Sequence, residues 1–249
     1  MLIAAAVCPH PPLLVPQVAA GAAGELAVLR AACDRAVAAL AASGPDVLAV
    51  VGAGGRDRDH PAAAGGGFAD YGVDLRVGEG EPVLPLSLTV GRWLAERAGV
   101  RPDRYAEVDA AAGPGRCLAR GAALAEAGRR VALLVMGDGS ARNGDAAPAP
   151  ADPEAPAFHG AVAAALAAAD ADALARLEPR TAERLLAQGR PAWQVLAGAA
   201  RALPAGYGAR GELLAHEAPY GVGYFVAVWT VAGRAAPPAA DGAVGGDRP

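Results

Sequence analysis

Lysine is missing from this chain, and aromatic residues are scarce. All 22 basic residues are arginine, and aromatic residues make up 4% of the 249 residues. The formal net charge at pH 7 is −4, and no cluster of basic residues stands out. Because binding to nucleic-acid phosphates needs a clustered basic face, we expect no nucleic-acid partner.

Cysteine is scarce as well. Cys8, Cys33 and Cys117 are an odd number, lie far apart and form no CxxC pair. A disulfide framework and a structural zinc site are therefore not expected. Cys8 and His10 could form a reactive or metal-binding pair, although a small buried cysteine at a strand end is the commoner case.

Long apolar runs are also absent, since no stretch reaches the roughly 20 residues of a membrane span without a break. The apolar run over 2–7 follows no basic leader and stops at Pro9, too early for a signal-peptide core with its cleavage site. The sequence therefore predicts a cytoplasmic protein with no membrane partner. Whether it forms a homo-oligomer is left open.

Short apolar runs and helix-like segments alternate along the chain, which predicts a single α/β domain over residues 1–234. The composition of 235–249 predicts a disordered tail. Long loops are expected over 53–70 and 141–156. The expected strands are 2–7, 46–52, a short edge strand over 71–77, 105–108, 131–136, 211–215 and 223–231, the last two as a hairpin; the expected helices are 18–43, 85–98, 115–128, 157–168, 172–177, 181–187 and 191–203.

The opening stretch, LIAAAVCPHPPLLVP, places a histidine at the end of a predicted strand. Prolines around His10 supply no backbone N–H donors, so the strand must stop there. In open α/β sheets ligands bind at strand ends, and the prolines restrict the backbone that presents the imidazole. His10 is therefore either a metal ligand or a histidine hydrogen-bonded within a Pro-rich turn.

The chain has four histidines, and at least three of them lie in loops at predicted strand ends. His60 follows the second strand, and His216 stands beside Glu217 before the last one. Two imidazoles and one carboxylate form the facial triad of non-haem iron(II) oxygenases. His10, His60 and Glu217 could supply this set, unless His60 is a solvated loop residue and Glu217 a surface carboxylate.

Three motifs carry a resemblance to a known family. The opening CPHPP, the GDGS corner at 137–140 and APYGVGY at 218–224 together resemble the class III extradiol ring-cleavage dioxygenases of the catalytic B-subunit type, and the related Memo-like proteins. The resemblance extends from about residue 1 to 234. It implies a three-layer α/β/α fold with a mostly parallel sheet and an Fe(II) site that binds a small catechol-type aromatic and dioxygen. His10 matches the first metal-ligand histidine of the family.

The chain also departs from the family at positions that matter for catalysis. A second histidine ligand is expected where this chain has Gly54 and Gly55, so His60 replaces it only if the loop folds back. The acid/base histidine is expected after a serine at the GDGS corner, where this chain has Ala141. His159 is a candidate substitute, and His216 competes with Glu217 as the carboxylate-side ligand.

Three functions follow from these observations. The first is a ring-cleaving oxygenase with a rearranged iron site of His10, His60 and Glu217, with Asp138 or His159 handling protons. The second is a family member that has lost catalysis and acts as a binding or regulatory module. The third is a Memo-like protein that binds a divalent metal such as Zn(II) and is not an oxygenase.

Overall fold

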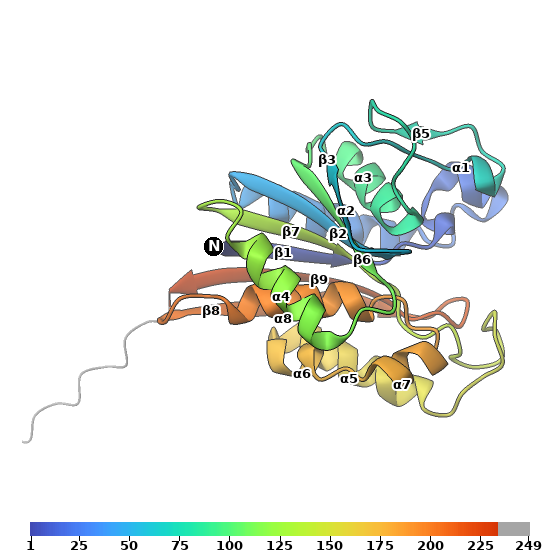
Figure 1. Cartoon of the computed structure of the whole chain (residues 1–249). Helices are drawn as coiled ribbons and strands as arrows, with labels where there is room; N and C mark the ends of the chain where they lie inside the picture. Colours follow the sequence, from blue (N-terminus) through green and yellow to red (C-terminus); the bar gives the residue numbers. More distant parts are fainter. Residues whose placement is uncertain (234–249) are drawn as a thin grey trace, which may run out of the picture.

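Seven strands form one mixed sheet at the centre of the molecule, in the order β3-β6-β2-β7-β1-β9-β8 (Figure 1). This computed structural model describes residues 1–233, so the tail expected over 235–249 lies outside the described residues. The four central strands are parallel, and β9, β8 and β3 are antiparallel to their neighbours. The strands are β1 (Leu2–Cys8), β2 (Val47–Gly54), β3 (Arg58–Pro61), β6 (Arg104–Asp109), β7 (Val131–Met136), β8 (Tyr207–Glu217) and β9 (Tyr224–Gly233).

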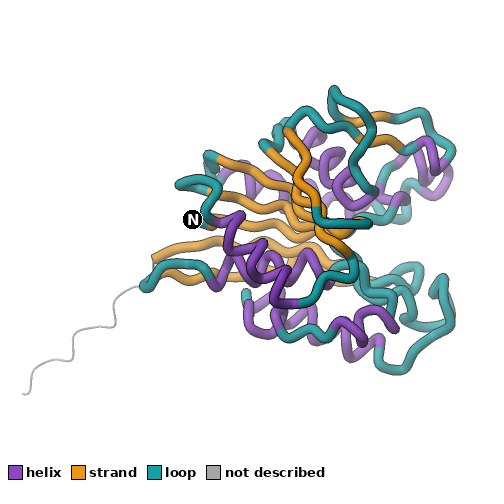
Figure 2. Tube along the Cα trace, in the orientation of Figure 1, coloured by secondary structure: helices purple, strands orange, loops and turns teal. Residues whose placement is uncertain are grey.

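Helices cover both faces of this sheet, which confirms the three-layer α/β/α prediction (Figure 2). Two hydrophobic cores result, one on each face. One face is covered by α2 (Ala27–Ala42) and α3 (Leu86–Arg97), with the short α1 (Pro16–Ala19) near them; the other is covered by α4 (Pro114–Ala125), α5 (Ala155–Ala168), α6 (Ala171–Ala175), α7 (Pro179–Arg184) and α8 (Arg190–Arg201). No helix within residues 1–233 is long and apolar enough to cross a membrane.

The parallel centre of the sheet follows from its sequence. All residues of β7 are buried, as are all but one of β1, because helices cover both faces there. The two strands pair in parallel, with Val7 opposite Val135 and Cys8 opposite Met136. Their carboxyl ends therefore lie side by side. The 141–154 segment lies beyond these ends, whereas the N-terminus lies at the other end of the strands (Figure 1).

Three sequence-based expectations need correction. The helix expected over 18–43 is broken, because α1 ends at Ala19 and α2 begins only at Ala27, after Gly21 and Gly24. The loop expected over 53–70 contains β3, which extends the main sheet, and β4 (Gly66–Gly67). The short strand expected over 71–77 is reduced to β5 (Arg76–Val77), which pairs with β4 in a separate two-stranded sheet.

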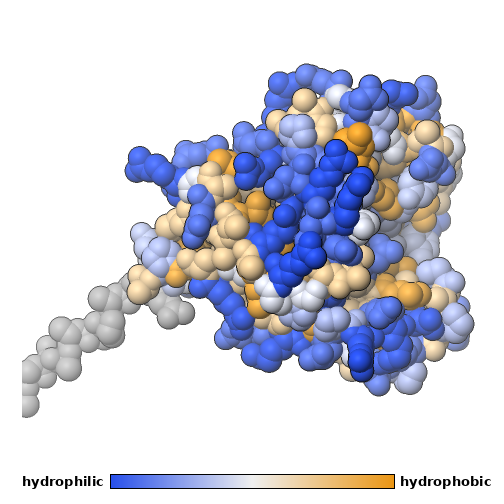
Figure 3. Space-filling view, viewed as in Figure 1, coloured by the Kyte–Doolittle hydropathy of each residue, from blue (hydrophilic) through white to orange (hydrophobic). Residues whose placement is uncertain are grey.

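The face that carries α4 is largely hydrophilic around its centre (Figure 3). Arginines of α4 form ion pairs with aspartates beside or within β3: Arg116 with Asp57, and Arg120 with Asp59 at 2.6 Å. Such pairs between partly exposed side chains contribute little to stability. The edge of the sheet at β3 is therefore covered by charged side chains.

Close contact between α4 and α8 depends on glycine. A Cβ atom at Gly121 of α4 would overlap the backbone at Val195, and one at Gly198 of α8 would overlap the backbone at Leu118. With few aromatic residues available, the two helices pack almost backbone to backbone instead of through large side chains.

We therefore expect Gly121→Ala to force α4 and α8 apart and to lower the free energy of unfolding by about 1–3 kcal/mol. The control is Gly160→Ala in α5, where an added Cβ meets nothing within 4 Å. That substitution should raise the free energy of unfolding by about 0.5–1 kcal/mol, because alanine is the better helix former. Urea denaturation measures both values, and equal effects of the two substitutions would contradict the packing described.

Candidate functional site

A cavity of about 470 Å³ opens beyond the carboxyl ends of β1 and β7. Its walls come from the segment after β1, the 138–148 segment, residues 186–188 before α8 and the β8–β9 turn. Most of the lining is apolar. The lining side chains that carry polar groups are His10, Asp138, Gln188, Tyr71, Tyr220 and Tyr224.

His10 and Asp138 form the polar centre of this cavity. The backbone N–H of His10 donates a hydrogen bond to Asp138 Oδ1 at 2.8 Å, and His10 Nδ1 lies 3.7 Å from the same oxygen. Both residues are buried. Burial raises the pKa of the Asp138 carboxyl, and the neighbouring His10 partly opposes this shift. Of the four residues that the strand ends predict to line one cleft, His10 and Asp138 line this cavity, whereas Gly54 and Glu217 do not.

Gln188 completes the surroundings of His10, with Oε1 3.3 Å from His10 Nε2. His10 donates to this oxygen when Nε2 carries the proton. His10 Nδ1 is buried and has no hydrogen-bond partner within residues 1–233. Tyr224 lies on the same cavity wall as Asp138, and burial raises the pKa of its phenol.

A short ladder of backbone hydrogen bonds supports the cavity wall. The N–H of Gly139 donates to the carbonyl of Gly223, the N–H of Gly223 donates to the carbonyl of Ser140, and the N–H of Asn143 donates to the carbonyl of Gly221. The segment after β7 and the turn between β8 and β9 are thereby joined. Ala141, at the position where the family resemblance places an acid/base histidine, presents a methyl group to the cavity.

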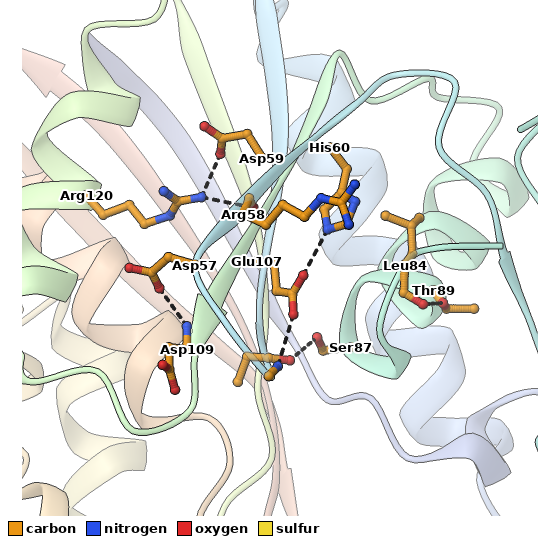
Figure 4. Close-up of polar contacts among 12 residues, drawn as sticks. Asp57, Arg58, Asp59, His60, Leu84, Ser87, Thr89, Glu107, Asp109 and Arg120 are labelled. Atoms are coloured by element: carbon orange, nitrogen blue, oxygen red, sulfur yellow. Dashed lines mark hydrogen bonds and ion pairs between the residues drawn. The ribbon is translucent and has the colours of Figure 1, made fainter. Parts of the chain in front are cut away.

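His60 lies in β3, away from the cavity (Figure 4). Its Nε2 is 3.0 Å from Glu107 Oε2, and the other oxygen of Glu107 accepts from the N–H of Gly55 at 3.0 Å. A Cβ atom at Gly54 would overlap this carboxylate. Glu107 therefore fills the space beside Gly54 and Gly55, where the resemblance implies a second histidine ligand.

Sheet order explains why His60 does not join His10. Strand β3 is four positions from β1 in the sheet, and neighbouring strands lie about 4.8 Å apart, so the two strands are roughly 19 Å from each other. The loop after β2 does fold back, but it does so onto the outer edge of β6 and not toward β1.

Glu217 and His216 end β8, and neither lines the cavity. Glu217 is paired with Tyr224 and His216 with Phe225, so the two side chains lie on opposite faces of the sheet. The ring of His216 stacks on Phe225, with centroids 4.9 Å apart. Of the two, only Glu217 lies on the face of Tyr224, a cavity residue.

His159 lies behind the cavity wall and not in its lining. Its Nε2 accepts a hydrogen bond from the backbone N–H of Ser140 at 2.9 Å, which requires a neutral nitrogen. Cβ atoms at Gly139 and Gly223 would overlap its ring. Burial, together with the nearby His216, lowers the pKa of His159. The geometry fits a structural acceptor that fixes the GDGS corner.

The residues of this chain do not fit a metal centre. Within residues 1–233, no group of three or more His, Cys, Asp and Glu side chains is placed to hold a metal ion. The set expected from sequence, His10, His60 and Glu217, is not brought together around the cavity. The cavity lining within residues 1–233 does not include the three ligands expected for Fe(II) or Zn(II).

Sequence reasoning missed Gln188 and Glu107. The sequence does indicate a role for Glu107, because an acidic residue inside the otherwise apolar strand 105–108 must have a partner if it is buried. No sequence pattern indicates Gln188, since it lies in the short connection between α7 and α8 and comes close to His10 only in the folded protein.

Comparisons with known proteins add little to this geometry. The sequence matches no family model and no curated protein. Among solved structures it is similar to the uncharacterized protein JW3007 from Escherichia coli K12, with 13% identity and a TM-score of 0.47, over 92% of this chain and 99% of that chain.

The environment of His159 predicts how stability depends on pH. The pKa of His159 in the folded state is lower than the roughly 6.5 of a histidine in an unfolded chain. As the pH falls below about 6.5, the unfolded state therefore binds more protons than the folded state. The contribution of neutral His159 is therefore complete above about pH 7 and is lost on acidification, by about 1.4 kcal/mol for each unit of pKa difference.

We expect His159→Gln to reduce the loss of unfolding free energy between pH 7.5 and pH 5, measured by urea denaturation. The glutamine carbonyl can still accept from Ser140. His216→Gln is the comparison and should remove a smaller part of the pH dependence, because burial is the larger cause of the shift at His159; its effect should not be zero, since the pKa of His216 is lowered by burial too. An unchanged pH dependence in His159→Gln would show that this histidine does not titrate as described.

Proposed function

We propose that this protein is a binding module that takes up a small, flat, apolar compound carrying a hydroxyl group. The compound would occupy the cavity beside His10 and Asp138. The observation that carries the proposal is a largely apolar cavity whose few polar groups include a buried histidine–carboxylate pair, with no group of three metal donors within the described residues 1–233.

The size and walls of the cavity support a small-molecule ligand. A volume of about 470 Å³ falls in the range of roughly 300–1,000 Å³ common for such sites. Prolines, leucines and three tyrosines line it, and such surfaces suit the faces of an aromatic ring. A strongly charged or large polymeric ligand is not favoured by this lining.

The polar groups support recognition of a hydroxyl. Among residues 1–233, the contact of His10 Nε2 is with Gln188 at 3.3 Å, which is longer than most hydrogen bonds between nitrogen and oxygen. A ligand hydroxyl could accept from His10 or donate to Asp138. Since hydrogen bonds to charged groups contribute about 1.5–3 kcal/mol, these two side chains would account for much of the binding selectivity.

Ring cleavage by iron and dioxygen is less well supported than binding. It would need three metal ligands and an acid/base group at the cavity, and the candidates are elsewhere: His60 pairs with Glu107, and His159 is held by Ser140. Ala141 offers no proton. The divalent-metal alternative meets the same lack of ligands.

Binding of catechol, measured by titration calorimetry, tests this proposal. We expect the same dissociation constant in EDTA and after anaerobic Fe(II) loading, because the binding groups are protein side chains. His10→Ala should weaken binding by about tenfold or more, equivalent to at least 1.4 kcal/mol. His60→Gln is the matched control and should bind catechol like the wild type, since His60 lies outside the cavity.

Other outcomes would overturn the proposal. Catechol binding that requires Fe(II), or stoichiometric iron that is lost in both His10→Ala and His60→Gln, would restore the metal-site hypothesis. Oxygen uptake with a ring-opened product at ordinary enzymatic rates, about 1–10³ s⁻¹, would show that the protein is an oxygenase.

A further inference from the structure

A second cavity of about 340 Å³ lies next to the first. It is bounded by the segment after β6, by α7 and by the start of α8. Leu186 and Gln188 line both cavities, so the segment that contains them separates the two. Leu186 has a positive φ of 55° and is 43% exposed, which is uncommon for a residue with a branched apolar side chain.

Arg190 lines this second cavity and is only 3% exposed. Its Nη1 donates to the carbonyl of Ala112 and to Gln194 Oε1, both at 2.8 Å, and its Nη2 donates to the carbonyl of Ala110 at 2.8 Å. All three acceptors are neutral. Arg190 forms no ion pair with any carboxylate in the part of the chain that the structure describes.

A buried guanidinium with neutral partners only is unusual. Buried charges are normally paired with an opposite charge, because removing an ion from water is costly. Burial lowers the pKa of Arg190, which reflects this cost. The thiol of Cys117 lies beside the guanidinium and partly opposes this shift, and the hydrogen bond that Nη2 donates to Ala110 is only partly buried.

The surroundings favour an anion at this nitrogen. Arg190 is the first residue of α8, a helix of 12 residues, whose positive dipole end adds to the field of the guanidinium. Apart from Gln188 and Glu183, the rest of the lining is apolar, mainly alanines and prolines. Glu183 is the one carboxylate in the lining, and it is exposed to water.

We infer that the second cavity is a binding site for a small monocarboxylate with an apolar body, and that Arg190 is its counter-charge. A monocarboxylate fits better than a phosphate, since a single guanidinium and apolar walls offer few of the donors that a phosphate needs. The site is separate from the proposed cavity beside His10 and stands whether or not that cavity binds a ligand.

Benzoate and benzamide test the inference, because they have the same shape and differ in charge. We expect benzoate to bind at least tenfold more tightly than benzamide, measured by calorimetry at low ionic strength. Glu183→Gln should tighten benzoate binding about two- to threefold, since it removes a negative charge from the rim. Both measurements leave the buried side chain of Arg190 unchanged.

Two substitutions locate the site. Arg190→Met should abolish the preference for benzoate, whereas Arg180→Met, which removes an exposed arginine of α7, should leave it within twofold. His10→Ala should not change benzoate affinity, which separates this site from the first cavity. Circular dichroism shows whether each variant is folded.

The inference is overturned if benzoate binds no more tightly than benzamide, or if folded Arg190→Met keeps the preference. It is also overturned if His10→Ala weakens benzoate binding, which would place the anion in the first cavity. Inorganic phosphate that displaces benzoate at equal concentration would show a general anion site instead of a carboxylate site.

Discussion

The parallel pairing of β1 with β7 is the constraint on which the candidate site depends. The register places Cys8 beside Met136, and the N–H of Gly137 donates to the carbonyl of Cys8 at 2.9 Å. Two residues further along, His10 and Asp138 must therefore meet. Their hydrogen bond, from the backbone N–H of His10 to the side chain of Asp138, follows directly after the last backbone pairing of the two strands, and both residues line the cavity.

Much of this arrangement could be predicted from sequence, because it depends on local signals. Apolar runs predict β1, β2 and β7, and prolines predict where β1 ends. Because parallel strands have their carboxyl ends at the same edge of a sheet, His10 and Asp138 are expected to lie close together. What sequence did not contain was strand order. The position of β3 beyond β6 decides that His60 lies far from His10, and no residue pattern in the 53–70 segment shows which edge it would join.

Histidines that looked alike in the sequence have different roles in the fold. His60 and His159 are both buried, yet each is engaged by a partner that no spacing rule connects to it: Glu107 across an antiparallel pair, and the backbone of Ser140 across the cavity wall. Burial of the ring in each case stabilises the fold and removes the side chain from the ligand-facing surface. A histidine at a strand end is therefore a weaker indicator of a ligand than its position suggests.

The backbone ladder that joins 139–143 to 221–223 has a consequence for how the cavity is held together. Its hydrogen bonds run between segments about 80 residues apart in sequence and lie directly beyond the ends of β7 and β9. The part of the wall at 139–143 is thus a small extension of the sheet, and its position is set by this pairing, whereas the part at 144–148 depends on the path of the loop. Insertions in that loop can change the part of the cavity that the loop lines, while His10 and Asp138 keep their positions.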